Sequence, residues 1–198
     1  MPVATPGRIA RPALARGIGD ALDAGSVLLV AGAGYGKTMA LEEAIAYSPR
    51  RTVWISCRDA GGEAGRVLMG TVDGLRATVP GLIDVVSERF GASSEPIDVR
   101  TAAGALLGEV ERLLVEPLTI VYDDAEEIAD SDGALALLDR MLDARVAPLS
   151  LAIATRRPLP LKLAKLRAGG RLTELGPAEL SFSAGECEGC CACAAGRA

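Results

Sequence analysis

The stretch VLLVAGAGYGKT, residues 27 to 38, is an apolar run that breaks into three glycines and ends on a lysine and a threonine. Val27 to Ala31 has the length and the β-branched content of a buried strand, and the residues after Thr38 read as a helix. A glycine-rich turn between a strand and a helix is the setting in which the pattern GxxxxGK[ST] holds phosphate groups. The stretch therefore predicts a phosphate-binding loop, although its first position is Ala31 rather than glycine.

The residue types of this loop suit a nucleoside triphosphate. Glycines let several backbone N–H groups approach one anion, and the start of the following helix adds partial positive charge. Lys37 is expected to neutralise the outer phosphates, and the Thr38 hydroxyl to ligate a magnesium ion that bridges them. The predicted contacts of ATP are Ala31, Gly32, Ala33, Gly34, Tyr35, Gly36, Lys37 and Thr38. A glycine-rich loop with a surface lysine is the alternative, which the flanking strand and helix disfavour.

A second apolar run, LTIVYDD at residues 118 to 124, ends in two carboxylates. Ligands of open α/β sheets lie at the carboxyl ends of the strands, so these acids are expected beside the phosphate loop. Successive strand residues point to opposite faces, which gives the two acids different roles. Asp123 is assigned to magnesium and Asp124 to positioning or deprotonating the attacking water, with Glu126 and Glu127 as weaker candidates. A solvated acidic loop is the alternative.

A third run, LAIATRRP at residues 151 to 158, ends its apolar part on Thr155 and Arg156. A guanidinium at the carboxyl end of a strand can sense or stabilise the terminal phosphate. Arg156 therefore joins Lys37 and Asp124 as a predicted catalytic residue. An ion pair between this arginine and a surface acid is an equally good explanation.

Strand-like and helix-like runs alternate along the chain. An opening helix carries apolar residues at helical spacing, and the helix after the loop is expected to turn Met39, Ile45 and Ala46 to the core. Further strands are expected at 52 to 57 and 149 to 156, an exposed loop at 87 to 96, and helices near 64 to 78, 101 to 114 and 132 to 144. Strands separated by helices predict a parallel sheet, with another strand inserted between the phosphate-loop strand and the acidic strand. The expected class is α/β: a P-loop NTPase of the ASCE type, whose parallel sheet is flanked by helices.

Length and composition exclude several kinds of function. The 198 residues suffice for one α/β domain and are short for two. The net charge is −5 and the chain has no histidine, so nucleic-acid binding by this chain alone is not expected. Neither a signal peptide nor a membrane-spanning stretch is apparent, which predicts a cytoplasmic protein that does not bind membranes.

Several motifs together resemble a known family. They are Arg11-Pro12, AGAGYGKT, VWIS, IVYDD, ATR followed by PLPL and LR, LTELG, and ELSFSAGE. In this order, over about residues 8 to 186, the chain is similar to the ATPase domain of the MalT-like, large ATP-binding LuxR-type transcriptional regulators, which are STAND NTPases. The family often has proline at Gly32 and a second threonine or serine at Met39, and it differs from this chain after WIS, where CRDAGGEAG follows.

The resemblance implies a regulatory switch rather than a metabolic enzyme. ATP with Mg²⁺ holds an active, often self-associating state, and slow hydrolysis resets it. The expected organisation is an N-terminal segment and helix over 1–24, the P-loop NTPase domain over 25–186 and a cysteine-rich tail over 187–198. Members of the family continue into sensor and DNA-binding domains, so the chain is expected to be a truncated regulator.

The tail is the least regular part of the sequence. The stretch SFSAGE begins like a capped helix, with Ser183 and Glu186 three residues apart. Four cysteines follow within seven residues, Cys187, Cys190, Cys191 and Cys193. Zinc sites separate their cysteine pairs by a longer segment, and a cytoplasmic location disfavours disulfides. The preferred hypothesis is a shifted reading frame, because GC-rich codons for GCCACAAGRA, read two bases on, encode LLRLRGRA, which would continue the helix.

The sequence is compatible with three functions. The first is the ATP-dependent switch, a weak ATPase. The second is a small-molecule kinase, whose lid would recruit Arg156, Arg157, Arg167 or Arg171. The third is a nucleotide-binding interaction module without turnover. An ATPase rate that needs no phosphate acceptor would favour the switch.

Overall fold

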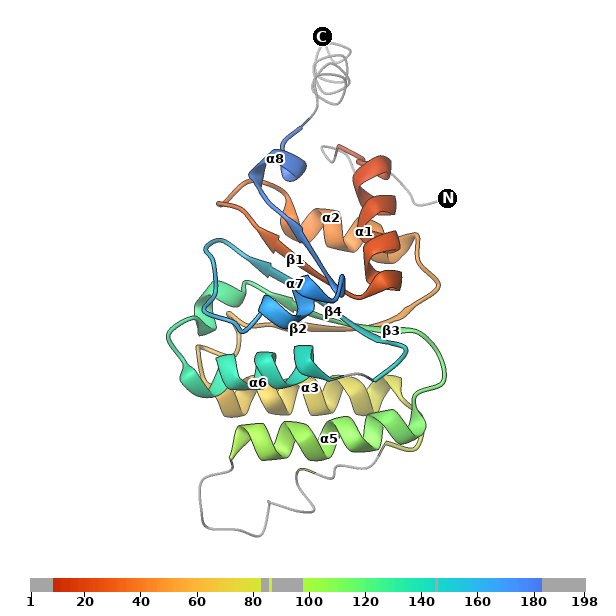
Figure 1. The fold of residues 1–198 in the computed structure, drawn as a ribbon, viewed down its shortest axis with the longest axis vertical. Helices are drawn as coiled ribbons and strands as arrows, with labels where there is room; N and C mark the ends of the chain where they lie inside the picture. Colours follow the sequence, from red (N-terminus) through yellow and green to blue (C-terminus); the bar gives the residue numbers. More distant parts are fainter. Residues whose placement is uncertain (1–8, 83–85, 87–97, 145, 183–198) are drawn as a thin grey trace.

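The computed structural model describes residues 9–182 except 83–85, 87–97 and 145, and a parallel β-sheet lies at its centre (Figure 1). The five strands stand in the order β2-β3-β4-β1-β5, and every pairing is parallel. β4 lies between β1 and β3, which confirms the expected inserted strand, whereas β2 lies at one edge. The strands are β1 (Ser26–Val30), β2 (Arg51–Ser56), β3 (Leu118–Asp123), β4 (Leu149–Thr155) and β5 (Leu172–Leu175).

Helices cover both faces of this sheet. α1 and α2 pack on one face, α3 and α6 lie on the other, and α5 packs on α3 and α6 as a further layer (Figure 1). The helices are α1 (Pro12–Ala24), α2 (Lys37–Ala46), α3 (Ala64–Thr78), α5 (Val99–Leu113), α6 (Asp132–Asp143), α7 (Ala164–Ala168), α8 (Pro177–Leu180) and the 3-10 turn η1 (Ala125–Ile128). The expected α/β class is therefore confirmed. None of the helices in the described ranges is both long and apolar enough to cross a membrane.

Alternate strand residues enter two separate cores, because successive side chains of a strand point to opposite faces. Val27 and Leu29 of β1 belong to the core beneath α1 and α2, whereas Leu28 belongs to the core beneath α3, α5 and α6. β3 is buried along its whole length, as expected for a parallel strand that is covered on both faces.

The core face of α2 differs from the expected one. Met39 and Ala46 are exposed, whereas Ile45 is partly buried and packs against the core as expected; the fully buried residues are Ala40, Leu41 and Ala44. α2 begins at Lys37 directly after the phosphate loop, so the loop fixes which side of the helix meets the sheet. Two of the three buried residues on that side are alanines, which give a weak apolar pattern in the sequence.

Three expectations lie outside the described residues. They are the exposed loop at 87 to 96, the helix cap of Ser183 and Glu186, and the cysteine-rich tail.

Two helical glycines give a matched test of packing against the sheet. A Cβ added to Gly74 of α3 would stand 2.3 Å from a methyl carbon of the buried Val53, whereas one added to Gly108 of α5 would meet no atom within 4 Å. Gly74→Ala is expected to lower the free energy of unfolding by about 1–3 kcal/mol through overpacking. Gly108→Ala is expected to raise it by about 0.5–1 kcal/mol through helix propensity. Urea denaturation measures both, and equal shifts of the two variants would contradict this packing.

Candidate nucleotide-binding site

Three strands, β1, β3 and β4, bring the predicted site residues to one edge of the sheet. In the strand register, Val30 of β1 lies opposite Thr155 of β4, and Asp123 of β3 lies opposite Ser56 of β2. Residues that follow parallel strands emerge together at the carboxyl edge of the sheet. The structure therefore places the phosphate loop, the two aspartates and the arginine after β4 at the same edge.

The phosphate loop turns on two glycines in the left-handed region. Gly34 has φ 84° and Gly36 has φ 71°, a conformation that residues with a side chain rarely adopt. No side chain caps the start of α2, which begins directly after Gly36. The amides of its first turn have no acceptor within the helix, so they can bind an anion.

Lys37 folds back on the loop from the first turn of α2. Its Nζ donates hydrogen bonds to the carbonyl oxygens of Ala31 at 2.7 Å and Gly32 at 3.0 Å. Burial lowers the pKa of Lys37, while the charge of Glu126 raises it and that of Arg156 lowers it. The ammonium group therefore lies within the charged cluster at the strand ends, as expected of a group that neutralises phosphate.

The two predicted magnesium ligands lie close enough to influence each other. Asp123 is only 7% exposed, and its carboxylate accepts a hydrogen bond at 2.9 Å from the backbone N–H of Asp124. Burial raises the pKa of Asp123, and the Thr38 hydroxyl and the Asp124 N–H oppose this rise. A hydroxyl and a carboxylate side by side are the hard oxygen ligands that magnesium prefers, so the residues present fit the ion.

Asp124 has different surroundings from Asp123. Its φ is 50°, a positive value that no other non-glycine residue of the described ranges adopts. Its carboxylate lies 3.2 Å from Arg58 and 3.7 Å from Arg156, with the side chain 29% exposed. Strained backbone of this kind clusters at functional sites. The assignment of different roles to the two acids is consistent with these surroundings and stays a prediction.

Arg156 pairs with two acids of the site. Its Nε lies 2.8 Å from Glu126, whose other oxygen accepts the backbone N–H of Arg156 at 2.9 Å, and its terminal nitrogen lies 3.7 Å from Asp124. The ion pair that was the alternative explanation for Arg156 therefore exists, but its partners are site residues. Arg157, in contrast, pairs with Asp130, whose side chain is 91% exposed.

Arg58 is a site residue that the sequence did not indicate. It follows β2, and its guanidinium contacts Asp124 at 3.2 Å and Glu127 at 3.9 Å. The one available signal was its place just after a strand, which puts it at the carboxyl edge with the other candidates.

Arg11 connects the start of the described chain to α2 and α8. Its guanidinium donates to the carbonyl oxygens of Leu180 and Ser181, each at 2.7 Å, and lies 4.7 Å from the centre of the Phe182 ring. Its backbone N–H donates to the Glu43 carboxylate of α2. Two small hollows flank the phosphate loop here, one lined by Arg11, Gly36, Met39 and Phe182 among others, and one lined by Ala33, Gly34, Tyr35 and Leu180 to Phe182.

Replacing Asp123 by asparagine tests the electrostatics of this edge. Folding raises the pKa of Asp123, so its ionised form destabilises the folded protein at pH values above that raised pKa. The penalty vanishes below the pKa of the unfolded chain, about 3.9. Asp123→Asn should therefore raise the melting temperature by a few degrees at neutral pH in EDTA, by an amount that shrinks toward pH 4. Asp20→Asn, at an exposed position of α1, is the control; a pH-independent gain for Asp123→Asn would contradict the argument.

Comparisons with known proteins identify structures of similar fold. No protein-family model and no curated protein matches the sequence. The Orc1 protein of Aeropyrum pernix, solved in complex with DNA, has a TM-score of 0.54 and 17% identity, over 96% of this chain and 50% of that chain. Drosophila ORC bound to AT-rich DNA and Cdc6 has a TM-score of 0.51 and 12% identity, over 85% of this chain and 58% of that chain. A STAND protein with a tetratricopeptide repeat sensor from Pyrococcus horikoshii has a TM-score of 0.48 and 17% identity, over 88% of this chain and 24% of that chain.

These similarities define the fold class of the protein. The first two structures share its architecture, so the predicted α/β fold with a parallel sheet flanked by helices is confirmed. The chain spans about half the length of the first of them. Membership of the MalT-like regulators is not shown. The expectation that this chain alone does not bind nucleic acid stays a prediction, because both of those structures contain DNA.

Proposed function

We propose that the protein is an ATP-binding, slowly hydrolysing switch domain of a MalT-like LuxR-type regulator. The observation that supports it most directly is that the buried carboxylate of Asp123 lies near the Thr38 hydroxyl, beside a loop whose lysine is influenced by the same acids. This arrangement joins a phosphate-binding element to a pair of magnesium ligands.

Each part of the loop has a role in this proposal. The amides at the start of α2 bind phosphate oxygens, and Lys37 neutralises the outer phosphates once it leaves its two carbonyl partners. Thr38 and Asp123 would hold magnesium, which when bound would neutralise part of the phosphate charge. The hollows beside Tyr35 and Arg11 leave room for a nucleoside next to the loop.

Slow hydrolysis follows from the contacts of the two candidate bases. Asp124 is held by Arg58 and Arg156, and Glu126 is held by Arg156. These ion pairs occupy carboxylate oxygens that would otherwise contact the attacking water. Arg156 can leave them when a terminal phosphate offers a competing anion, which would free Glu126 and leave Asp124 paired with Arg58 alone.

The kinase alternative is less well supported, since the arginines that a lid would need are elsewhere. Arg157 pairs with Asp130 and Arg167 pairs with Glu174. Arg171 precedes β5 and lines a cavity with residues that begin β1 and β4, at the edge opposite the phosphate loop. Of the four candidates, only Arg156 contacts the site acids.

ATP binding and turnover without an acceptor test the proposal. Calorimetry should show one MgATP bound per chain, and phosphate release should be slow and insensitive to added small-molecule acceptors. Release that requires an acceptor would favour a kinase, and binding with no release at all would favour an interaction module. Light scattering with and without ATP tests the accompanying proposal that the ATP state self-associates.

A further inference from the structure

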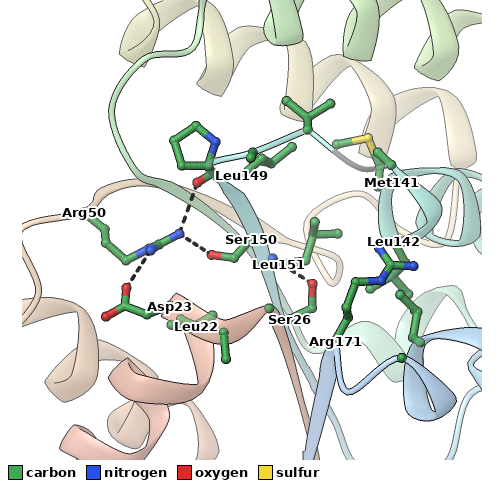
Figure 2. A pocket seen from close by; sticks show the side chains of 18 residues that line it. Leu22, Asp23, Ser26, Arg50, Met141, Leu142, Leu149, Ser150, Leu151 and Arg171 are labelled. Atoms are coloured by element: carbon green, nitrogen blue, oxygen red, sulfur yellow. Dashed lines mark hydrogen bonds and ion pairs between the residues drawn. The ribbon is translucent and has the colours of Figure 1, made fainter.

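A cavity of about 480 Å³ lies at the amino-terminal edge of the sheet, opposite the phosphate loop (Figure 2). It opens where β1 and β4 begin, and the end of α6 and the turn after α7 contribute to its walls. A volume of this size is typical of sites for small molecules. The proposed switch function does not use it.

One wall is rigid and polar. The side chain of Arg50 is 8% exposed and forms an ion pair with Asp23 at 2.7 Å. It also donates to the hydroxyl oxygens of Ser150 at 2.7 Å and Thr119 at 3.0 Å and to the Pro148 carbonyl at 3.2 Å. Arg50 is thus satisfied by the protein and holds this wall in place.

The opposite wall carries a second arginine whose charge is not paired in the same way. The backbone of Arg171 is fixed, because its carbonyl accepts the N–H of Ser26 at 2.9 Å and its N–H donates to Leu166 at 3.0 Å. Its guanidinium makes no hydrogen bond or ion pair with any residue in the described part of the chain. Figure 2 shows Arg171 and Leu142 across the cavity from Arg50 and Asp23.

The balance of charge around the cavity is positive. Among the described lining residues Asp23 is the only acid, and it is already paired with Arg50. The positive charge of Arg171 therefore has no counter-charge on the cavity wall. A half-buried guanidinium in this position favours an anionic ligand.

A buried hydroxyl adds a directional donor. Ser26 is 8% exposed, and its Oγ accepts the backbone N–H of Leu151 at 3.3 Å. The hydroxyl proton of Ser26 has no acceptor within the described residues. The rest of the lining is largely apolar and includes Leu22, Met141, Leu142, Leu151 and Leu166.

We propose that this cavity binds a small organic carboxylate with an apolar body. The carboxylate pairs with the fork of Arg171 and accepts the proton of Ser26, while the apolar body lies against Leu142 and Leu166. A single uncompensated guanidinium balances the single charge of a carboxylate, whereas a phosphate monoester would bring nearly two charges. The site is separate from the phosphate loop and holds whether or not the chain hydrolyses ATP.

Calorimetry on the whole chain tests this site with butanoate, hexanoate, octanoate and their primary amides. Saturable binding of the acids, tightening with chain length, is expected, and the uncharged amides should bind about tenfold more weakly or worse. Arg171→Gln should weaken octanoate by a similar factor, and Ser26→Ala by less. Arg66→Gln, which alters an exposed arginine of α3 paired with Glu63, should have no effect.

Three further measurements make the result decisive. Lys37→Ala should leave octanoate binding unchanged, because the phosphate loop is not the site. Amide NMR signals of Ser26 and Leu151 should shift on addition of octanoate. Arg171→Lys keeps the positive charge but loses the two-pronged geometry of the guanidinium, so it should give an intermediate affinity for octanoate. It replaces Arg171→Gln as the test if that variant does not fold. Equal binding of acids and amides, unchanged affinity in both Arg171 variants, or shifts confined to the phosphate loop would each overturn the proposal.

Discussion

Lys37→Ala is expected to abolish the rise in melting temperature that MgATP gives to the parent protein. A ligand present at a hundred times its dissociation constant stabilises the folded state by about 2.7 kcal/mol, which for a chain of this length is roughly 5–10 °C. Lys37 is the basic side chain of the phosphate loop, and its Nζ already lies against the loop carbonyls of Ala31 and Gly32. Without it, the loop has no side-chain charge to oppose the outer phosphates.

The unliganded variant should fold as well as the parent. Burial lowers the pKa of Lys37, which shows that the charged group is held at some cost in this position. Lys165→Ala, at an exposed position of α7, is the matched control and should keep the full MgATP shift. If Lys37→Ala also keeps the full shift, the nucleotide does not bind at this loop and the site assignment is wrong.

Asp124→Asn is expected to keep the MgATP shift and to slow phosphate release by roughly 10²–10⁴-fold, the usual contribution of a general base. The ground-state contacts come from the phosphate loop and from Asp123, and this substitution leaves them in place. Asparagine retains the shape of the side chain but cannot accept a proton. Single-turnover measurements at saturating MgATP separate this effect from any change in product release.

Glu126→Gln distinguishes the two acids nearest to Arg156. Glu126 accepts a hydrogen bond from the backbone N–H of Arg156, forms an ion pair with its side chain and is largely buried, so its role in the structure is to hold that arginine. Glu126→Gln should slow phosphate release less than Asp124→Asn does. The opposite order of effects would transfer the role of the base to Glu126.

Local patterns in the sequence were sufficient to predict most of the elements. The strands have uninterrupted apolar runs, and the longer helices have apolar residues at helical spacing. The phosphate loop and the acidic end of β3 carry combinations of residues that are typical of phosphate and magnesium binding. The inserted strand was expected as well, since parallel strands linked by helices permit few orders. All of these features are determined by residues that lie close together in the sequence.

The features that were missed depend on long-range packing. The core face of α2 follows from how the phosphate loop sets the helix on the sheet, and no pattern of large apolar residues marks it. Arg58 reaches Asp124 only because β2 pairs with β3. Arg171 was a candidate for a lid over the phosphates, but it precedes β5 and therefore lies at the opposite edge of the sheet. Its position follows from the direction of β5, which runs parallel to β1.

The strand order also determines when the phosphate loop can form during synthesis. β1 pairs with β4 and β5, both of which are made more than a hundred residues later, whereas β2 and β3 pair with each other. A nascent chain that has emerged only as far as α6 therefore holds its phosphate-loop strand without a neighbour, and closing that long loop makes the pairing slow. The phosphate loop, which follows β1, is thus held by a complete sheet only after β4 and β5 have been synthesised.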